Sequence, residues 1–157
     1  MYARAVSTDP LDRWTSAWLT MVRTHARLWE QLEAQMRNET GLTMSRYDVL
    51  MQLDMAGGRL GLSELASTIV LSPSGLSKLL DRMEASGLIR RQPDPRDARS
   101  TFARITPRGR SLVAKARRHH HAWLQKSFAD ALDDRDLADL NRIMGRIAAR
   151  NPTAQAG

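Results

Sequence analysis

The sequence predicts a mainly α-helical protein with a small β-hairpin. Apolar residues recur at helical spacing over 11–38 and again over 107–128. Between these stretches lie two short helical segments, each opened by a serine, and then two β-rich segments separated by a proline-containing turn. With 157 residues, of which 42% are hydrophobic, the chain can form one good core rather than several separate domains.

The first predicted element is a helix over 11–38. Its apolar stripe includes Trp14, Trp18, Leu28 and Trp29. A helix of about 28 residues is roughly 40 Å long, which is more than one small lobe can cover. We therefore expect a second subunit to bury its far end.

The second helix is expected after Gly41, which ends the first. Thr43 or Ser45 can cap it, and its inward stripe is expected to be Tyr47, Leu50 and Leu53. Gly57-Gly58 then interrupts the chain.

Two short helices follow, and we expect Ser63 to cap the first and Ser72 the second. Pro73 then occupies the first helical position, where its missing N–H is tolerated. The inward residues of the second helix are expected to be Leu76, Leu80 and Met83, and the outward ones Ser74, Ser77, Lys78, Asp81 and Arg82.

The hairpin is expected after Gly87, a typical helix terminator, with strands over 88–92 and 100–105. Thr106-Pro107 repeats the combination of cap and proline and opens a long helix. Asp133, with Asp136 three residues later, predicts the start of a last helix that ends at Asn151-Pro152.

Charge and composition restrict the function. The net charge is +7, and residues 78–118 carry 12 basic and 4 acidic side chains, a local net charge of +8. This favours a polyanionic partner, either nucleic acid or an anionic membrane surface, although a solvated arginine-rich surface explains the charge equally well. The absence of cysteine excludes disulfides and thiolate zinc sites. No apolar run of transmembrane length and no signal-peptide core is found, so we expect a cytoplasmic protein without membrane contact.

The second short helix is the first candidate for binding DNA. A helix that enters the major groove needs an outer face that is small and polar. The candidate recognition residues are Ser72, Ser74, Gly75, Ser77, Lys78 and Arg82. An ordinary amphipathic helix with a polar outer face explains this pattern equally well.

The hairpin turn is the second candidate. Arg96 and Arg99 lie at its tip, a geometry suited to the negative potential of a narrow minor groove. Asp94 and Asp97 can hold these arginines through charge-assisted bonds. The alternative is a solvated hairpin whose charges pair with each other.

These motifs resemble the MarR family of transcription regulators over roughly residues 28–147. The resemblance is carried by Leu65-Ala66, Ser72-Pro73-Ser74, 80–84 (LDRME), 87–91 (GLIRR), the pattern Asp94-x-Arg96-Asp97-x-Arg99, and Ile105-Thr106-Pro107-x-Gly109. Two features depart from the family pattern: Gly75 stands where a larger residue is common, and the first helix is rich in tryptophan.

The resemblance implies a dimeric winged helix–turn–helix protein of about six helices. Residues 1–157 would form one subunit, with a DNA-binding lobe at 43–106, a dimerisation region at 10–40 and 107–150, and flexible tails at 1–9 and 151–157. Two recognition helices, 72–82 in each subunit, would read a pseudo-palindrome. Arg96 would be the wing-tip residue, and Asp94 and Arg99 would order the wing or contact phosphate. Members of this family are more often repressors.

The resemblance also implies a small aromatic effector, bound between the dimerisation helices and the DNA-binding lobe. Candidate pocket residues are Trp18, His25, Met51 and Met55, although core or dimer contacts explain them as well. We expect no metal and no cofactor, because the three histidines at 119–121 fan apart on a helix. No catalytic motif is found, so we expect no enzymatic activity.

The leading hypothesis is therefore a homodimeric, sequence-specific regulator that binds double-stranded DNA. An architectural protein that coats or bends DNA through the same basic segment is the alternative. A dimeric protein-interaction module with an incidental basic surface is a third, weaker one.

Overall fold

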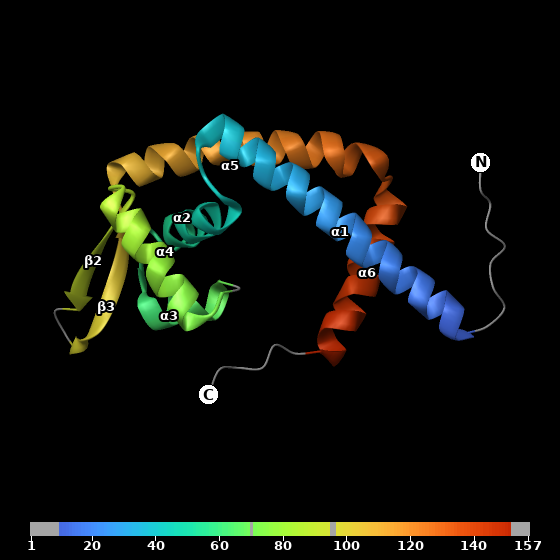
Figure 1. Cartoon of the computed structure of the whole chain (residues 1–157), viewed down its shortest axis with the longest axis horizontal. Coiled ribbons are helices and arrows are strands. Elements are labelled where there is room, and N and C mark those ends of the chain that lie inside the picture. The colour runs from blue at the N-terminus through green and yellow to red at the C-terminus, as the bar shows by residue number, and fades with distance from the viewer. Residues whose placement is uncertain (1–9, 70, 95–96, 152–157) are drawn as a thin grey trace.

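The computed structural model describes residues 10–69, 71–94 and 97–151. Within them the chain forms six α-helices, one 3₁₀ helix and three strands. Figure 1 shows that α2, α3, α4 and the strands form a lobe beside one half of α5, whereas α1 and α6 extend from the other half. The elements are α1 (Pro10–Thr40), α2 (Met44–Met55), β1 (Arg59–Gly61), α3 (Leu62–Thr68), α4 (Pro73–Ala85), β2 (Ile89–Asp94), β3 (Asp97–Ile105), α5 (Pro107–Ser127), η1 (Ala129–Ala131) and α6 (Asp134–Arg150).

Helix α1 contains 31 residues and therefore extends about 46 Å. Its C-terminal part packs into the core through Leu32 and Met36, whereas Trp14 and Trp18 leave 67% and 60% of their surface exposed. Gly41, with φ +72°, ends the helix as predicted. Within one chain the N-terminal turns of α1 thus have an uncovered apolar face.

The core of the lobe is formed by the predicted inward stripes. Buried side chains come from α2 (Tyr47, Leu50, Leu53) and from α4 (Leu76, Leu80, Met83). Ile89, Ala103 and Ile105 add the inner face of the sheet to the same cluster. Thr43 caps α2 by accepting a hydrogen bond from the backbone N–H of Arg46. The two helices and the sheet therefore share one apolar core.

The sheet has three antiparallel strands in the order β1-β3-β2. The predicted hairpin of β2 and β3 is confirmed. Strand β1 was not predicted, because it has just three residues, too few to show alternation in the sequence. Gly58, with φ +102°, turns the chain into β1, and its carbonyl accepts a hydrogen bond from Ile105 N at 2.9 Å. Strands β2 and β3 are also longer than predicted.

Helix α3 begins differently from the prediction. Ser63 does not cap it; the helix starts at Leu62, and Gly61 occupies the cap position without a side-chain hydrogen bond. The physical reason is that β1 runs directly into α3, and the pairing of Gly61 with Phe102 fixes the last strand residue.

The start of α5 is held against the end of α4. Thr106 Oγ1 accepts from Gly109 N at 3.0 Å and donates to the Gly87 carbonyl at 2.7 Å. A Cβ on Gly109 would lie 2.2 Å from the Leu88 carbonyl oxygen, so this close approach requires glycine. Gly87 itself has φ +69° and ends α4 as predicted.

Helix α6 starts with the predicted reciprocal cap between Asp133 and Asp136. It ends at Arg150 and is followed by Asn151, whereas 1–9 and 152–157, predicted to be flexible, lie outside the described residues. None of the described helices combines the length and the apolar character needed to cross a membrane.

Candidate nucleic-acid interface

Helix α4 starts with an N-cap, followed by proline and small residues in its first turn. Ser72 Oγ accepts a hydrogen bond from Gly75 N at 3.2 Å, and Pro73 is the first helical residue. A Cβ on Gly75 would lie 3.0 Å from Ser72 Oγ, closer than ordinary van der Waals contact. A side chain at position 75 would therefore require the Ser72 hydroxyl to shift by a few tenths of an ångström.

One face of α4 is free for contact. Ser74, Ser77, Lys78 and Arg82 are all exposed, on the side opposite to the buried leucines and Met83. Ser72 is exposed as well and Gly75 is half-buried. The predicted recognition residues therefore lie together on α4, where two short hydroxyls and two long cations can meet base edges and phosphates.

The wing is formed by β2 and β3. Asp94 ends β2 and is half-buried, while Asp97 and Arg99 belong to β3. Arg96 lies outside the described residues, and so do the side chains of Asp97 and Arg99. The predicted roles of Asp94, Arg96, Asp97 and Arg99 consequently stay predictions.

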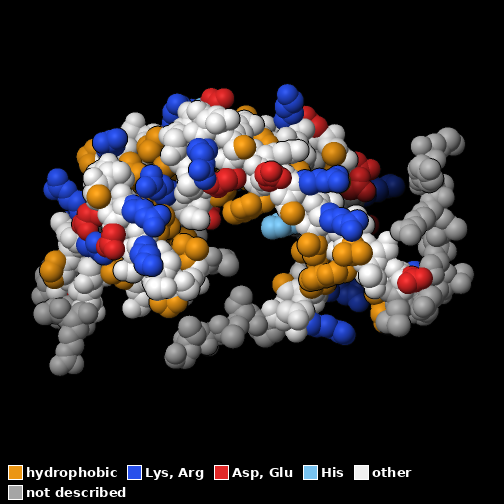
Figure 2. Space-filling view, in the orientation of Figure 1, with side chains coloured by type: hydrophobic (Ala, Val, Ile, Leu, Met, Phe, Trp, Pro, Cys, Tyr) orange, Lys and Arg blue, Asp and Glu red, His pale blue; other side chains and the backbone are white. Residues whose placement is uncertain are grey.

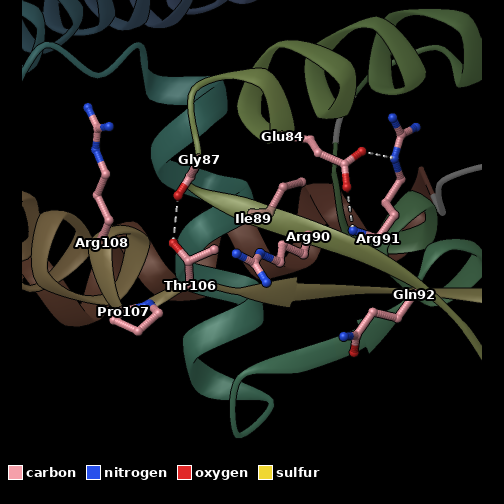
Figure 3. A pocket seen from close by; sticks show the side chains of 9 residues that line it. All are labelled: Glu84, Gly87, Ile89, Arg90, Arg91, Gln92, Thr106, Pro107 and Arg108. Carbon is pink, nitrogen blue, oxygen red and sulfur yellow. Dashed lines mark hydrogen bonds and ion pairs between the residues drawn. The ribbon is translucent and has the colours of Figure 1, made fainter.

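Arg91 joins the wing to α4, a contact that the sequence analysis missed (Figure 3). Its Nε donates to Glu84 at 2.8 Å. Its Nη2 donates to Asp81, which the figure does not draw, at 2.6 Å. The backbone N–H of Arg91 also donates to Glu84, at 2.7 Å. The sequence signal that could have predicted this contact is the position of Glu84 and Arg91 on either side of Gly87. The turn at Gly87 brings the end of a helix beside the start of a strand.

The hydrogen bonds at this joint shift the titration of both partners. The backbone N–H of Arg91 and then its guanidinium lower the pKa of Glu84, and the hydrogen bonds that the guanidinium donates to Glu84 and Asp81 raise the pKa of Arg91. Both groups therefore stay charged at neutral pH. The joint fixes the wing strand relative to the candidate recognition helix.

Basic side chains are visible over the lobe in the space-filling view, whereas hydrophobic side chains gather on α1 (Figure 2). The sign of the charge over the lobe suits a phosphate backbone.

Comparison with known proteins identifies the family. A model described as the MarR family matches residues 40–100. AbsC, a MarR family transcriptional regulator from Streptomyces coelicolor, has 32% sequence identity and a TM-score of 0.83, with 93% of this chain and 97% of that chain covered. The chain belongs to the MarR family of transcriptional regulators.

Two further relatives agree with this assignment. Sco3205 from S. coelicolor, a MarR family regulator solved in complex with DNA, has 25% identity and a TM-score of 0.82, covering 88% of this chain and 92% of that chain. The transcriptional repressor IacR from Pseudomonas putida is 28% identical over 127 residues, 81% of this chain and 73% of its own length. The predicted fold and the prediction of a DNA-binding regulator are confirmed, and sequence-specific binding is favoured over an architectural role.

The candidate effector residues of this MarR family protein lie on two helices, Trp18 and His25 on α1 and Met51 and Met55 on α2. The His25 ring stacks on Trp29 with 6.0 Å between the ring centroids, and Met51 Sδ accepts from Arg117 at 3.4 Å. None of the four candidate residues lines the two open hollows beside β2 and the start of α5. An effector site formed by the four residues stays a prediction.

The histidines at 119–121 face different neighbours. His120 Nδ1 lies 3.4 Å from the hydroxyl of the buried Tyr47, and burial lowers the pKa of His120. His119 Nδ1 lies 3.9 Å from a Glu39 carboxylate oxygen. In the part of the chain that the structure describes, no three His, Cys, Asp or Glu side chains gather in a way that could hold a metal.

Proposed function

We propose that this MarR family regulator binds a pseudo-palindromic operator as a homodimer, with α4 of each subunit in a major groove and each wing in the flanking minor groove. The observation that carries the proposal is the exposed polar and basic face of α4, opposite its buried stripe. The DNA complex of Sco3205 supports it. In this proposal 43–106 contact DNA, and 10–40 and 107–150 hold the two subunits together.

The proposed dimer is supported by the apolar surface that a single chain leaves open. The exposed large apolar residues on α1 are Trp14, Trp18, Leu19, Val22 and Trp29, and those on α6 are Leu140, Ile143, Met144 and Ile147. Monomeric proteins rarely expose contiguous patches of this kind. A second copy would bury both surfaces in an isologous contact.

We further propose that the protein is a repressor released by a small aromatic molecule, and that it acts in the cytoplasm, where bacterial DNA lies, without catalysis. The repressor IacR supports the first part. Trp18, His25, Met51 and Met55 are the proposed effector contacts, since aromatic rings and flexible thioethers suit an aromatic ligand.

Fluorescence anisotropy with operators selected from genomic fragments tests the proposal. Lys78→Ala should weaken binding. If Lys78 contacts a base, the loss should be roughly 1–3 kcal/mol; if it contacts a phosphate, the slope of log affinity against log salt concentration should decrease by about one. Lys126→Ala is the matched control, because Lys126 is exposed near the far end of α5. Equal effects of the two substitutions would contradict the proposed interface.

A further inference from the structure

Three arginines form a row across the outer face of the sheet. Arg104 in β3 is the register partner of both Arg90 in β2 and Arg59 in β1. Directly opposed residues of antiparallel strands point to the same face, with Cβ atoms about 5 Å apart. All three are exposed, whereas Ala103 and Ile105, which alternate with Arg104, are buried. This arginine row (Arg59, Arg90, Arg104) therefore faces solvent.

The arginine row has no carboxylate partner among the described residues, since none of its members forms an ion pair. Like charges opposed across strands are destabilising. Neighbouring Arg91 differs, because its charge is balanced by Glu84 and Asp81. A bound anion would relieve the repulsion that the row retains.

The surroundings of the row suit phosphate oxygens. Arg90 and Gln92 line two adjoining open hollows of about 650 and 330 Å³, and Arg104 lines the smaller one. Arg108, in the first turn of α5, lines the larger one without an ion pair of its own (Figure 3). Guanidinium groups present several donors in a plane, which matches the geometry of a phosphate.

We propose that the arginine row binds the sugar-phosphate backbone of the DNA that flanks the operator. This inference rests on the proposed function, in which the wing enters a minor groove. Arg90 lies four residues before Asp94, the end of β2, which places the row about 13 Å from the hairpin end. The minor groove is about 7.5 Å deep. If the hairpin end reaches the floor of the groove, the row lies about 6 Å above the phosphates at the rim, a distance that an extended arginine side chain spans.

The direction of the sheet agrees with this assignment. Its inner face packs on the lobe that carries α4, so its outer face is turned away from α4. In the proposed complex this outer face would lie against the DNA that flanks the base pairs bound by α4. The phosphates contacted there would lie outside the base pairs read by α4. They would add affinity without sequence preference.

The test compares two duplexes that carry the same selected operator. The short duplex ends just beyond the minor groove that the wing is proposed to enter, and the long duplex is extended by about 10 base pairs, one helical turn, on each side. Full-length wild type, Arg90→Gln/Arg104→Gln and the control Arg118→Gln/Lys126→Gln are measured over a range of salt. The control removes the same charge from exposed positions of α5 that form no ion pair. Because α5 belongs to the proposed dimerisation region, analytical ultracentrifugation verifies that the control dimerises like wild type before DNA binding is compared.

If each subunit contacts about two flanking phosphates, the dimer contacts about four. The plot of log affinity against log salt concentration for wild type should then be steeper by about 3.6 on the long duplex than on the short one. Its affinity advantage over the short duplex should then fall by roughly 100-fold between 50 and 200 mM salt. The double variant should lose this advantage and the hydroxyl-radical protection of the flanks, yet bind the short duplex like wild type. The control should keep both.

Three results would overturn the inference. If the double variant retains the wild-type difference between the duplexes, the row does not contact the flanks. If the duplexes bind alike while inorganic phosphate shifts the arginine NMR signals of wild type and not of the double variant, the row takes a free phosphate instead of DNA. If wild type binds neither duplex, the proposed function fails as well, which distinguishes that failure from the other two.

Discussion

Replacing Arg91 by alanine should loosen the wing from α4. The substitution removes the bonds to Glu84 at 2.8 Å and to Asp81 at 2.6 Å but keeps the backbone N–H that donates to Glu84. The side chains of Arg91, Glu84 and Asp81 are 30%, 35% and 57% exposed, so solvent screens the joint in part. Hydrogen bonds to charged groups contribute about 1.5–3 kcal/mol and exposed ion pairs about 0–1, which places the expected loss near 1–2 kcal/mol.

Urea unfolding followed by circular dichroism measures this loss, read from the midpoint at unchanged slope. Arg90→Ala is the matched control, because the adjacent Arg90 is exposed and forms no ion pair. Its free energy of unfolding should stay within about 0.5 kcal/mol of wild type. A loss below 0.5 kcal/mol for Arg91→Ala, or an equal loss for Arg90→Ala, would refute the reasoning.

Acid should remove the contribution of the same joint. The pKa of Glu84 is lowered in the folded protein, chiefly by the backbone N–H of Arg91. As pH falls, Glu84 is therefore protonated in the unfolded protein before it is protonated in the folded protein. The stabilisation by the Glu84 carboxylate is complete above the ordinary glutamate pKa, about 4.3, and is lost as pH falls through the lower pKa of the folded protein. The stability difference between wild type and Glu84→Gln should shrink below pH 4. A difference that stays constant to pH 2 would show that the charge of Glu84 contributes nothing.

Further substitutions address other parts of the protein. Gly109→Ala should cost about 1–3 kcal/mol in urea unfolding, since its Cβ would meet the Leu88 carbonyl; wild-type stability would show that α5 can move away. Arg96→Ala should weaken operator binding by roughly 1–3 kcal/mol, measured by anisotropy; unchanged affinity would leave Arg96 in solvent. Trp14→Ser/Trp18→Ser should raise the dimer dissociation constant in analytical ultracentrifugation, and an unchanged constant would place the interface elsewhere.

The predictions that held depend on local sequence. Ser72-Pro73 and Gly87 delimit α4 through a cap, a fixed φ and a positive φ, all of which are properties of neighbouring residues. The reciprocal cap of Asp133 and Asp136 is of the same kind. Such signals can be read from the sequence because they involve one turn of helix.

The features that were missed join distant segments. Strand β1 exists because β3 supplies its hydrogen bonds, and its three residues carry no periodic signal of their own. The joint of Arg91 with Glu84 and Asp81 depends on how β2 lies against α4. The arginine row likewise appears only once the register of the three strands is known.

The central claim, a symmetric reader of specific sites, is tested most directly by selecting bound fragments from the protein's own genome and sequencing them. A homodimer that places α4 in two successive major grooves should recover inverted repeats whose half-sites are centred about 10 base pairs, one helical turn, apart. Broad coverage of the genome without a shared repeat would contradict the claim.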